Sequence, residues 1–74
     1  MKYIHKEEDN GSWHEMNVEM PTTTSDVEVI DKNGSIFLAE IVVEMSGYYI
    51  YFRGEDEKSG WGSLGDYSHW RFRA

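Results

Sequence analysis

The chain has 74 residues, of which 39% are hydrophobic and 15% aromatic, enough for one small domain over residues 1–74 and too few for two. Fourteen acidic residues against seven basic ones give a formal net charge of -7, which argues against general binding to the phosphate backbone of nucleic acid. Cysteine is absent, and neither a signal-peptide pattern nor a long apolar run occurs, so we expect a soluble cytoplasmic protein with no membrane partner.

The segment before Pro21 fits two kinds of element. The spacing of Trp13, Met16 and Met20 suits a helix, whereas the alternation of Met16, Val18 and Met20 suits a strand. We favour a short strand or turn, followed by an irregular approach to Pro21. That proline stands in the Thr/Ser-rich stretch MPTTTSD, which is typical of a loop.

From residue 26 onward, apolar residues alternate with polar ones and predict strands separated by turns. Asn33-Gly34 and Ser46-Gly47 supply the glycine that tight hairpin turns require. The glycine-rich and charged stretch that follows the third strand predicts a long exposed loop. The predicted strands are residues 26–30, 35–45, 48–53 and 67–73, and the predicted loop is residues 54–66.

These elements predict an all-β or mainly β fold, a small antiparallel meander of about four to five strands, with a partly closed barrel as an open alternative. An N-terminal strand would be the fifth. In the last strand the alternation places Tyr67 with His69 and the arginines on one side, and Trp70 with Phe72 on the other. The predicted core is Phe37, Ile41, Val43, Ile50, Phe52, Trp70 and Phe72, joined by Val27 and Val29.

The opposite side of the sheet is also partly apolar, so it needs a cover. The N-terminal segment could supply one through Trp13, and a second copy of the chain, forming a homodimer, is the other candidate. The residues concerned are Ile36, Leu38, Val42, Tyr49 and Tyr51.

No motif in the sequence predicts catalysis, a cofactor or a metal site, and we do not expect an enzyme. The three histidines match no ligand spacing, and the glycines of GWGSLG are typical of turns, because no helix is expected after them. One alternative is a minimal enzyme in which His69 acts as acid or base near Asp66. Another is a small-ligand or carbohydrate module that uses the exposed aromatic residues.

The residues that we expect to contact a partner combine acidic and aromatic side chains. Trp61 is either a cap over the sheet edge, which we favour, or an exposed recognition residue. Tyrosines on one face of a strand suit stacking, although packing against neighbouring strands is the favoured interpretation. Acidic side chains would present a negative field to a basic protein. The candidate residues are Glu40, Glu44, Tyr49, Tyr51, Glu55, Asp56, Glu57 and Trp61.

The order of several short elements resembles a family of short phage and prophage proteins of unknown function. These elements are Trp13, Met20-Pro21, the Val27-x-Val29 strand with Asp31, Ala39, and the final His69-Trp70. The resemblance implies a phage origin and brings no catalytic residues. Small acidic phage proteins often act by occupying a host protein, and some imitate the charge of DNA. It therefore implies stoichiometric binding, in the host cytoplasm, to a host protein with a basic surface, such as a nuclease or defence complex, of the anti-restriction or anti-CRISPR type.

Overall fold

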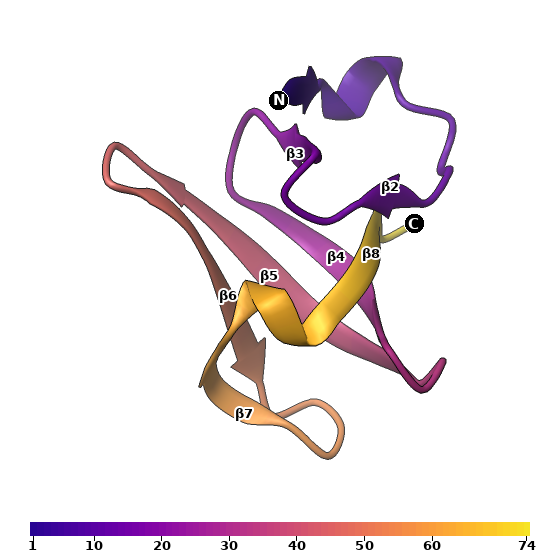
Figure 1. Cartoon of the computed structure of the whole chain (residues 1–74), viewed down its shortest axis with the longest axis vertical. Helices are drawn as coiled ribbons and strands as arrows, with labels where there is room; N and C mark the ends of the chain where they lie inside the picture. The colour runs from indigo at the N-terminus through magenta and orange to yellow at the C-terminus, as the bar shows by residue number, and fades with distance from the viewer.

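Two sheets make up the computed structural model, which describes residues 1–74 (Figure 1). The larger sheet has six antiparallel strands in the order β2-β8-β4-β5-β6-β7, and the smaller pairs β1 with β3 in parallel. The strands are β1 (Lys2–Ile4), β2 (His14–Glu15), β3 (Glu19–Pro21), β4 (Ser25–Asp31), β5 (Ile36–Glu44), β6 (Gly47–Arg53), β7 (Ser59–Gly62) and β8 (Tyr67–Phe72).

The predicted mainly β class is confirmed, although the number of strands exceeds the predicted four to five. The large sheet does not close into a barrel, because β2 and β7 are both edge strands. The helical segments are two 3-10 turns, η1 (Lys6–Glu8) and η2 (Leu64–Asp66). No helix has the length and apolar character needed to cross a membrane.

Two hairpins form the middle of the large sheet, as predicted. Between β4 and β5 the Asp31 carboxylate accepts hydrogen bonds from the main-chain N–H groups of Asn33 and Ser35, both at 2.9 Å. Gly34 has φ +88° in this turn, a conformation in which a Cβ atom would be strained. The hydrogen bonds that the Asp31 carboxylate accepts thus fix the position at which the chain reverses.

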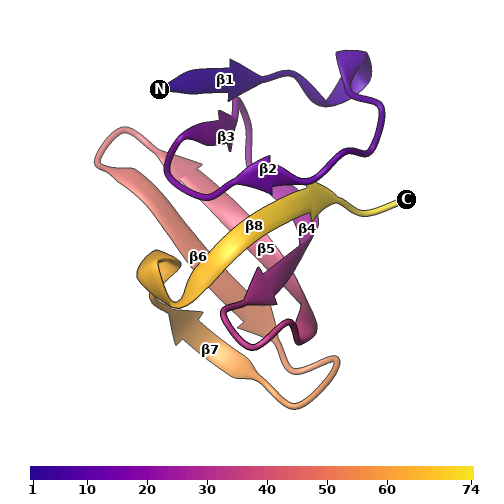
Figure 2. The ribbon, with the colours of Figure 1, turned by 45° about the vertical axis from the view of Figure 1, so that its right-hand side comes forward.

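The position of the last strand differs from the predicted meander, in which each strand pairs with the one before it. The predicted loop 54–66 contains β7, which takes the free edge of β6, so β8 instead pairs with β4, where Val29 lies opposite Trp70. Figure 2 shows β8 beside β4, with β7 at the other end of the sheet. The chain reaches β8 through η2.

A β-bulge in β8 corrects the predicted position of Tyr67. His69 lies opposite Ile30 while Tyr67 lies opposite Asp31, so Ser68 is the additional residue on β8. The bulge turns Tyr67 to the same side as Trp70, where it is 6% exposed. Its ring packs against Phe52 with 5.6 Å between ring centroids. Simple alternation had placed Tyr67 on the outer side with His69.

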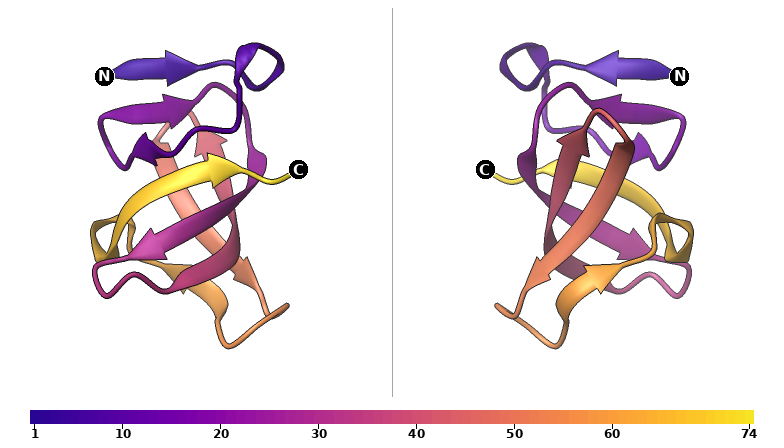
Figure 3. Two further views of the ribbon diagram at one scale, coloured as in Figure 1. Left: turned by 90° about the vertical axis from the view of Figure 1, so that its right-hand side faces the viewer. Right: turned by 90° about the vertical axis from the view of Figure 1, so that its left-hand side faces the viewer.

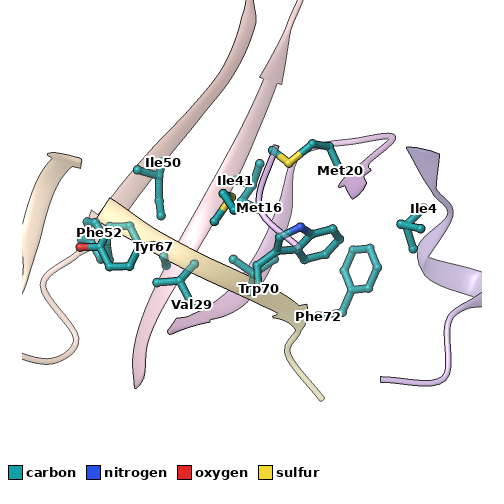
Figure 4. Close-up of a cluster of buried hydrophobic side chains, with 12 residues drawn as sticks. Ile4, Met16, Met20, Val29, Ile41, Ile50, Phe52, Tyr67, Trp70 and Phe72 are labelled. Atoms are coloured by element: carbon teal, nitrogen blue, oxygen red, sulfur yellow. The ribbon is translucent and has the colours of Figure 1, made fainter. Parts of the chain in front are cut away.

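The core confirms most of the predicted set. Figure 4 shows Trp70 at its centre, with Phe52 and Tyr67 toward one end and Ile4 at the other. Phe37 and Val43 differ from the prediction, because they are partly exposed and pack against the rim of the core. The predicted core residues that are buried are Val27, Val29, Ile41, Ile50, Phe52, Trp70 and Phe72.

The N-terminal segment covers one end of this core rather than the outer side of the sheet (Figure 3). It adds Ile4, Met16 and the fully buried Met20 to the core cluster. Trp13 reaches the outer side at the β8 end, where the Arg71 guanidinium carbon lies 4.4 Å from its ring centroid. The N-terminal segment is therefore wrong as the predicted cover over β5 and β6, and the alternative of a second copy of the chain stays a prediction.

Candidate functional site

The uncovered outer side of β5, β6 and β7 carries a group of aromatic and acidic side chains, which we call the Trp61 face. Val42 lies opposite Tyr49, and Tyr51 lies opposite Trp61. Glu44 belongs to the same side, two residues after Val42 on β5, because alternate residues of a strand share a face. The Trp61 face is defined as Val42, Glu44, Tyr49, Tyr51 and Trp61.

Glycines on either side of Trp61 explain why β7 presents this residue. Gly62 lies opposite Ile50, and a Cβ atom there would come within 2.7 Å of the Phe52 ring. Gly60, with φ +80°, lies opposite Phe52. The inward side of β7 therefore has no side chains, and its one large side chain points outward.

Trp61 is 66% exposed, so it does not cap a buried sheet edge as favoured from the sequence. Its ring lies edge-on to Tyr51 at 5.0 Å and to Tyr49 at 6.3 Å between ring centroids. Such edge-to-face pairs are attractive and hold a ring in one orientation. The indole is thus supported from one side and open on the other.

A hollow of about 290 Å³ lies beside Trp61. It is lined by Glu44, Ser46, Tyr49 and Trp61. The Ser46 hydroxyl and the Tyr49 phenol share a 2.7 Å hydrogen bond, which fixes the Tyr49 side chain against the turn between β5 and β6. Apolar ring faces, hydroxyl groups and one carboxylate therefore meet at this point of the surface.

Glu40, predicted as a partner contact, is instead engaged within the sheet. Its carboxylate pairs with Arg53, which also lies 3.1 Å from an oxygen of Asp26. The hydrogen bond to Glu40, followed by the charge of Asp26, raises the pKa of the Arg53 guanidinium. Arg53 offsets only one of these two negative charges, but the ion pair holds the Glu40 carboxylate within the sheet, so Glu40 is not a free partner contact.

The acidic loop after β6 is also partly engaged. The Leu38 main-chain N–H donates to Asp56 at 2.9 Å, and the same carboxylate accepts from the Lys58 N–H at 3.2 Å. Glu55 pairs with Arg73 at 3.3 Å. Glu57 is exposed and forms no ion pair, but it lines a different hollow, on the β7–β8 side of Trp61.

The structure thus brings together four of the eight predicted contact residues: Glu44, Tyr49, Tyr51 and Trp61. Ser46 was predicted only as a turn residue and not as part of the site. Its position in the turn just before Tyr49 was the one feature of the sequence that could have indicated this role. Val42 was assigned to this side of the sheet but not to the site.

The alternative acid–base pair of His69 and Asp66 is not formed. His69 lines a small hollow with Trp13 and Ile30, whereas Asp66 belongs to the hollow beside Glu57. No ion pair joins the two side chains. Their proximity in sequence therefore does not place them in one site.

A polar cluster that sequence analysis did not identify lies around His14. Its Nε2 atom is 2.8 Å from a carboxylate oxygen of Asp9, and both side chains are under one-tenth exposed. Its Nδ1 atom faces Glu19 at 3.6 Å, and its ring packs on Trp70 with 4.7 Å between centroids. Since carboxylates flank both ring nitrogens, this cluster joins the N-terminal segment to the core rather than presenting a free imidazole.

The largest hollow, of about 370 Å³, lies near the C-terminus and is lined mainly by charged residues. Its arginines are already engaged, Arg71 with Glu28 at 2.8 Å and Arg73 with Glu55 at 3.3 Å. The Trp61 face is therefore the stronger candidate, because its exposed groups have fewer partners in the protein.

No model of a protein family matches the chain, and no curated protein or solved structure matches it either. The resemblance to short phage proteins therefore stays a prediction, and the Trp61 face is the feature that bears on function.

Proposed function

We propose that this protein acts by binding another protein stoichiometrically, through the Trp61 face and a basic patch on the partner. The observation that carries the proposal is the exposed Trp61, held on a strand beside Tyr49 and Tyr51. Tryptophan and tyrosine supply a disproportionate share of the binding energy at protein interfaces. A clustered exposed aromatic surface also costs free energy in water unless a partner covers it.

The net charge of -7 supports a basic partner. A negative field accelerates the encounter with a positive surface and disfavours acidic proteins. Glu44 lies within the Trp61 face and forms no ion pair. We therefore assign affinity mainly to the aromatic contacts, and the association rate and selectivity to the charge.

The phage resemblance extends the proposal to a host nuclease or defence complex as the partner. Two modes of inhibition are then open, imitation of DNA and simple occlusion. DNA presents a dense line of phosphate charges, whereas on the outer side Asp26 and Glu40 share Arg53, and Glu28 is paired with Arg71. These pairs favour occlusion through the aromatic surface.

Position-specific crosslinking tests the proposal. A photoreactive amino acid would replace Met45, which is fully exposed beside Glu44, or Lys32, which lies in the turn at the opposite end of β5. Both proteins, with and without Trp61→Ala, would be exposed to a bacterial lysate at about 50 mM and about 500 mM salt. We expect a partner that crosslinks from position 45 only, requires Trp61, is retained less at high salt and binds one-to-one when purified.

Three results would contradict the proposal: equal crosslinking from both positions, a partner indifferent to Trp61→Ala, or a second copy of this chain as the crosslinked species. Charge reversal at Asp56 would be a poor test, because this carboxylate also holds the Leu38 N–H. Glu44→Lys is the informative reversal.

A further inference from the structure

At one place in the protein, an arginine of the chain itself stacks on a tryptophan and is paired with a carboxylate. The Arg71 guanidinium carbon lies 4.4 Å from the ring centroid of Trp13. Arg71 Nε also donates to the Glu28 carboxylate at 2.8 Å. An indole face and a carboxylate thus hold one arginine together, combining the cation–π attraction with a charge-assisted hydrogen bond.

The hollow beside Trp61 supplies the same two groups without the cation. Trp61 and Glu44 both line it, and neither lysine nor arginine does. No cation lies over the Trp61 ring, and Glu44 forms no ion pair. Tyr49 adds a second ring and, with Ser46, hydroxyl oxygens that can accept hydrogen bonds.

We infer that this hollow receives the guanidinium group of a single arginine of the protein partner, stacked on Trp61 and paired with Glu44. The inference rests on the proposed function, because the partner supplies the arginine. Arginine fits better than lysine, since its planar group stacks on a ring, offers several N–H donors to the carboxylate and is more weakly hydrated. The volume of about 290 Å³ lies just below the range for small-molecule clefts, so this open hollow suits one side chain rather than a whole ligand.

Titration with a minimal probe tests the inference without the partner. N-acetyl-arginine methylamide would be added at constant ionic strength while the indole N–H signals are followed by NMR. We expect a saturable shift of the Trp61 signal, with a dissociation constant on the order of 10 mM, consistent with a weak exposed contact. The Trp13 signal is the internal control, because Arg71 already occupies that ring.

The chemistry of the site is tested by changing the probe and the carboxylate. The lysine analogue should bind more weakly, and the uncharged citrulline analogue should not bind measurably. Glu44→Gln should weaken arginine binding about threefold, the amount that a surface ion pair contributes. The matched control is Glu7→Gln, which also removes one charge but lies in the exposed η1 and lines no hollow.

Equal shifts with citrulline or a methyl glucoside, tighter binding of lysine, or equal losses in the two glutamine variants would overturn the inference. These results are separable from failure of the proposed function. A partner that crosslinks in a Trp61-dependent manner, with no response to the arginine probe, would sink the inference alone. A clear probe response without any such partner would sink the proposed function alone.

Discussion

The indole Nε1 of Trp70 donates a 2.7 Å hydrogen bond to the main-chain carbonyl of Glu19, a residue 51 positions earlier in the chain. Trp70 is fully buried at the centre of the core (Figure 4). One side chain therefore fills the core and also satisfies a carbonyl group of the N-terminal segment.

Trp70→Ala should lower the free energy of unfolding by about 3 to 5 kcal/mol, because it leaves a large cavity. Trp70→Phe retains an aromatic ring but leaves the Glu19 carbonyl without its donor, which should cost about 1 to 3 kcal/mol. Urea denaturation of both variants measures this order. A Trp70→Ala protein that unfolds at the wild-type urea concentration would contradict the assignment, and the phenylalanine variant keeps the test measurable if the alanine variant does not fold.

The His14 cluster should contribute to stability through Asp9. His14→Ala would leave a carboxylate that is only 7% exposed without its partner, so we expect a loss of about 3 kcal/mol. His5→Ala is the matched control, since His5 is exposed and its side-chain hydrogen bond, between Nδ1 and the Thr22 hydroxyl, is long at 3.5 Å. That variant should stay within about 0.5 kcal/mol of wild type.

A double-mutant cycle completes this test. Asp9→Ala combined with His14→Ala should cost less than the sum of the two single changes, because neither group is then left unpaired. Additive losses would show that the two side chains do not act as a pair.

The strands between residues 26 and 53 were predictable because their signals are local. Alternation assigns each side chain to a face, and Gly34 and Gly47 mark the reversals. The inward face of these strands followed, since residues paired across a hairpin share a face, but the depth of burial along it did not, because Phe37 and Val43 lie at the rim and Ala39 is buried. Register needed no information from distant parts of the chain.

The elements that prediction missed depend on distant contacts. Tyr67 is turned inward by a bulge opposite β4. The glycine-rich β7 has no inward side chains, and Ile50 and Phe52 fill the space that a side chain at Gly62 would occupy. Met20 is apolar, but it is buried in a core cluster that includes Trp70, far along the chain. Local patterns carry none of this information.

The candidate site was predicted in part for the same reason. The aromatic residues of β6 share a face by alternation alone, and Trp61 stands out by composition. Which carboxylates are free could not be predicted, because the partners of Glu40 and Glu55 are Arg53 and Arg73, brought close by strand pairing and by the folded loop. Glu44 and Glu40 look alike in sequence and differ only in the fold.

Asp56 should stabilise the loop between β6 and β7. Asp56→Ala removes the acceptor for the Leu38 and Lys58 N–H groups, and we expect a loss of about 1 kcal/mol. Glu57→Ala, on the adjacent exposed residue, should change stability by less than about 0.5 kcal/mol. Thermal unfolding of the two variants provides the comparison, and equal midpoints would show that the loop contacts are not stabilising.

Stability should fall at alkaline pH through Tyr48. Burial, and then the charge of Tyr3, raises the pKa of the Tyr48 phenol above 10.0. The folded state then holds the Tyr48 proton more tightly than the unfolded state, so its contribution is complete below about pH 10 and is lost as pH rises through the folded pKa. The difference in urea midpoint between wild type and Tyr48→Phe should be constant from about pH 8 to pH 9 and shift in favour of the variant above about pH 10. A constant difference throughout would refute this role.

Gly62 should be a glycine that is sensitive to substitution in both folding and binding. A Cβ atom at this position would meet the Phe52 ring at 2.7 Å and Ile50 at 3.2 Å, while its backbone has an ordinary negative-φ conformation. Gly62→Ala must therefore move β7 or Phe52, at a cost of about 1 to 3 kcal/mol. Gly65→Ala is the control, because the nearest atom, Ser63 Oγ, is 3.8 Å away.

Since Trp61 precedes Gly62 on the same short strand, a displaced β7 also moves the indole relative to Glu44 and Tyr49. Gly62→Ala should therefore weaken arginine-probe binding even under conditions where the variant is fully folded, while Gly65→Ala should leave it unchanged. NMR titration at low temperature separates this effect from unfolding. Wild-type affinity in a folded but destabilised Gly62→Ala protein would mean that the position of β7 does not determine the geometry of the hollow.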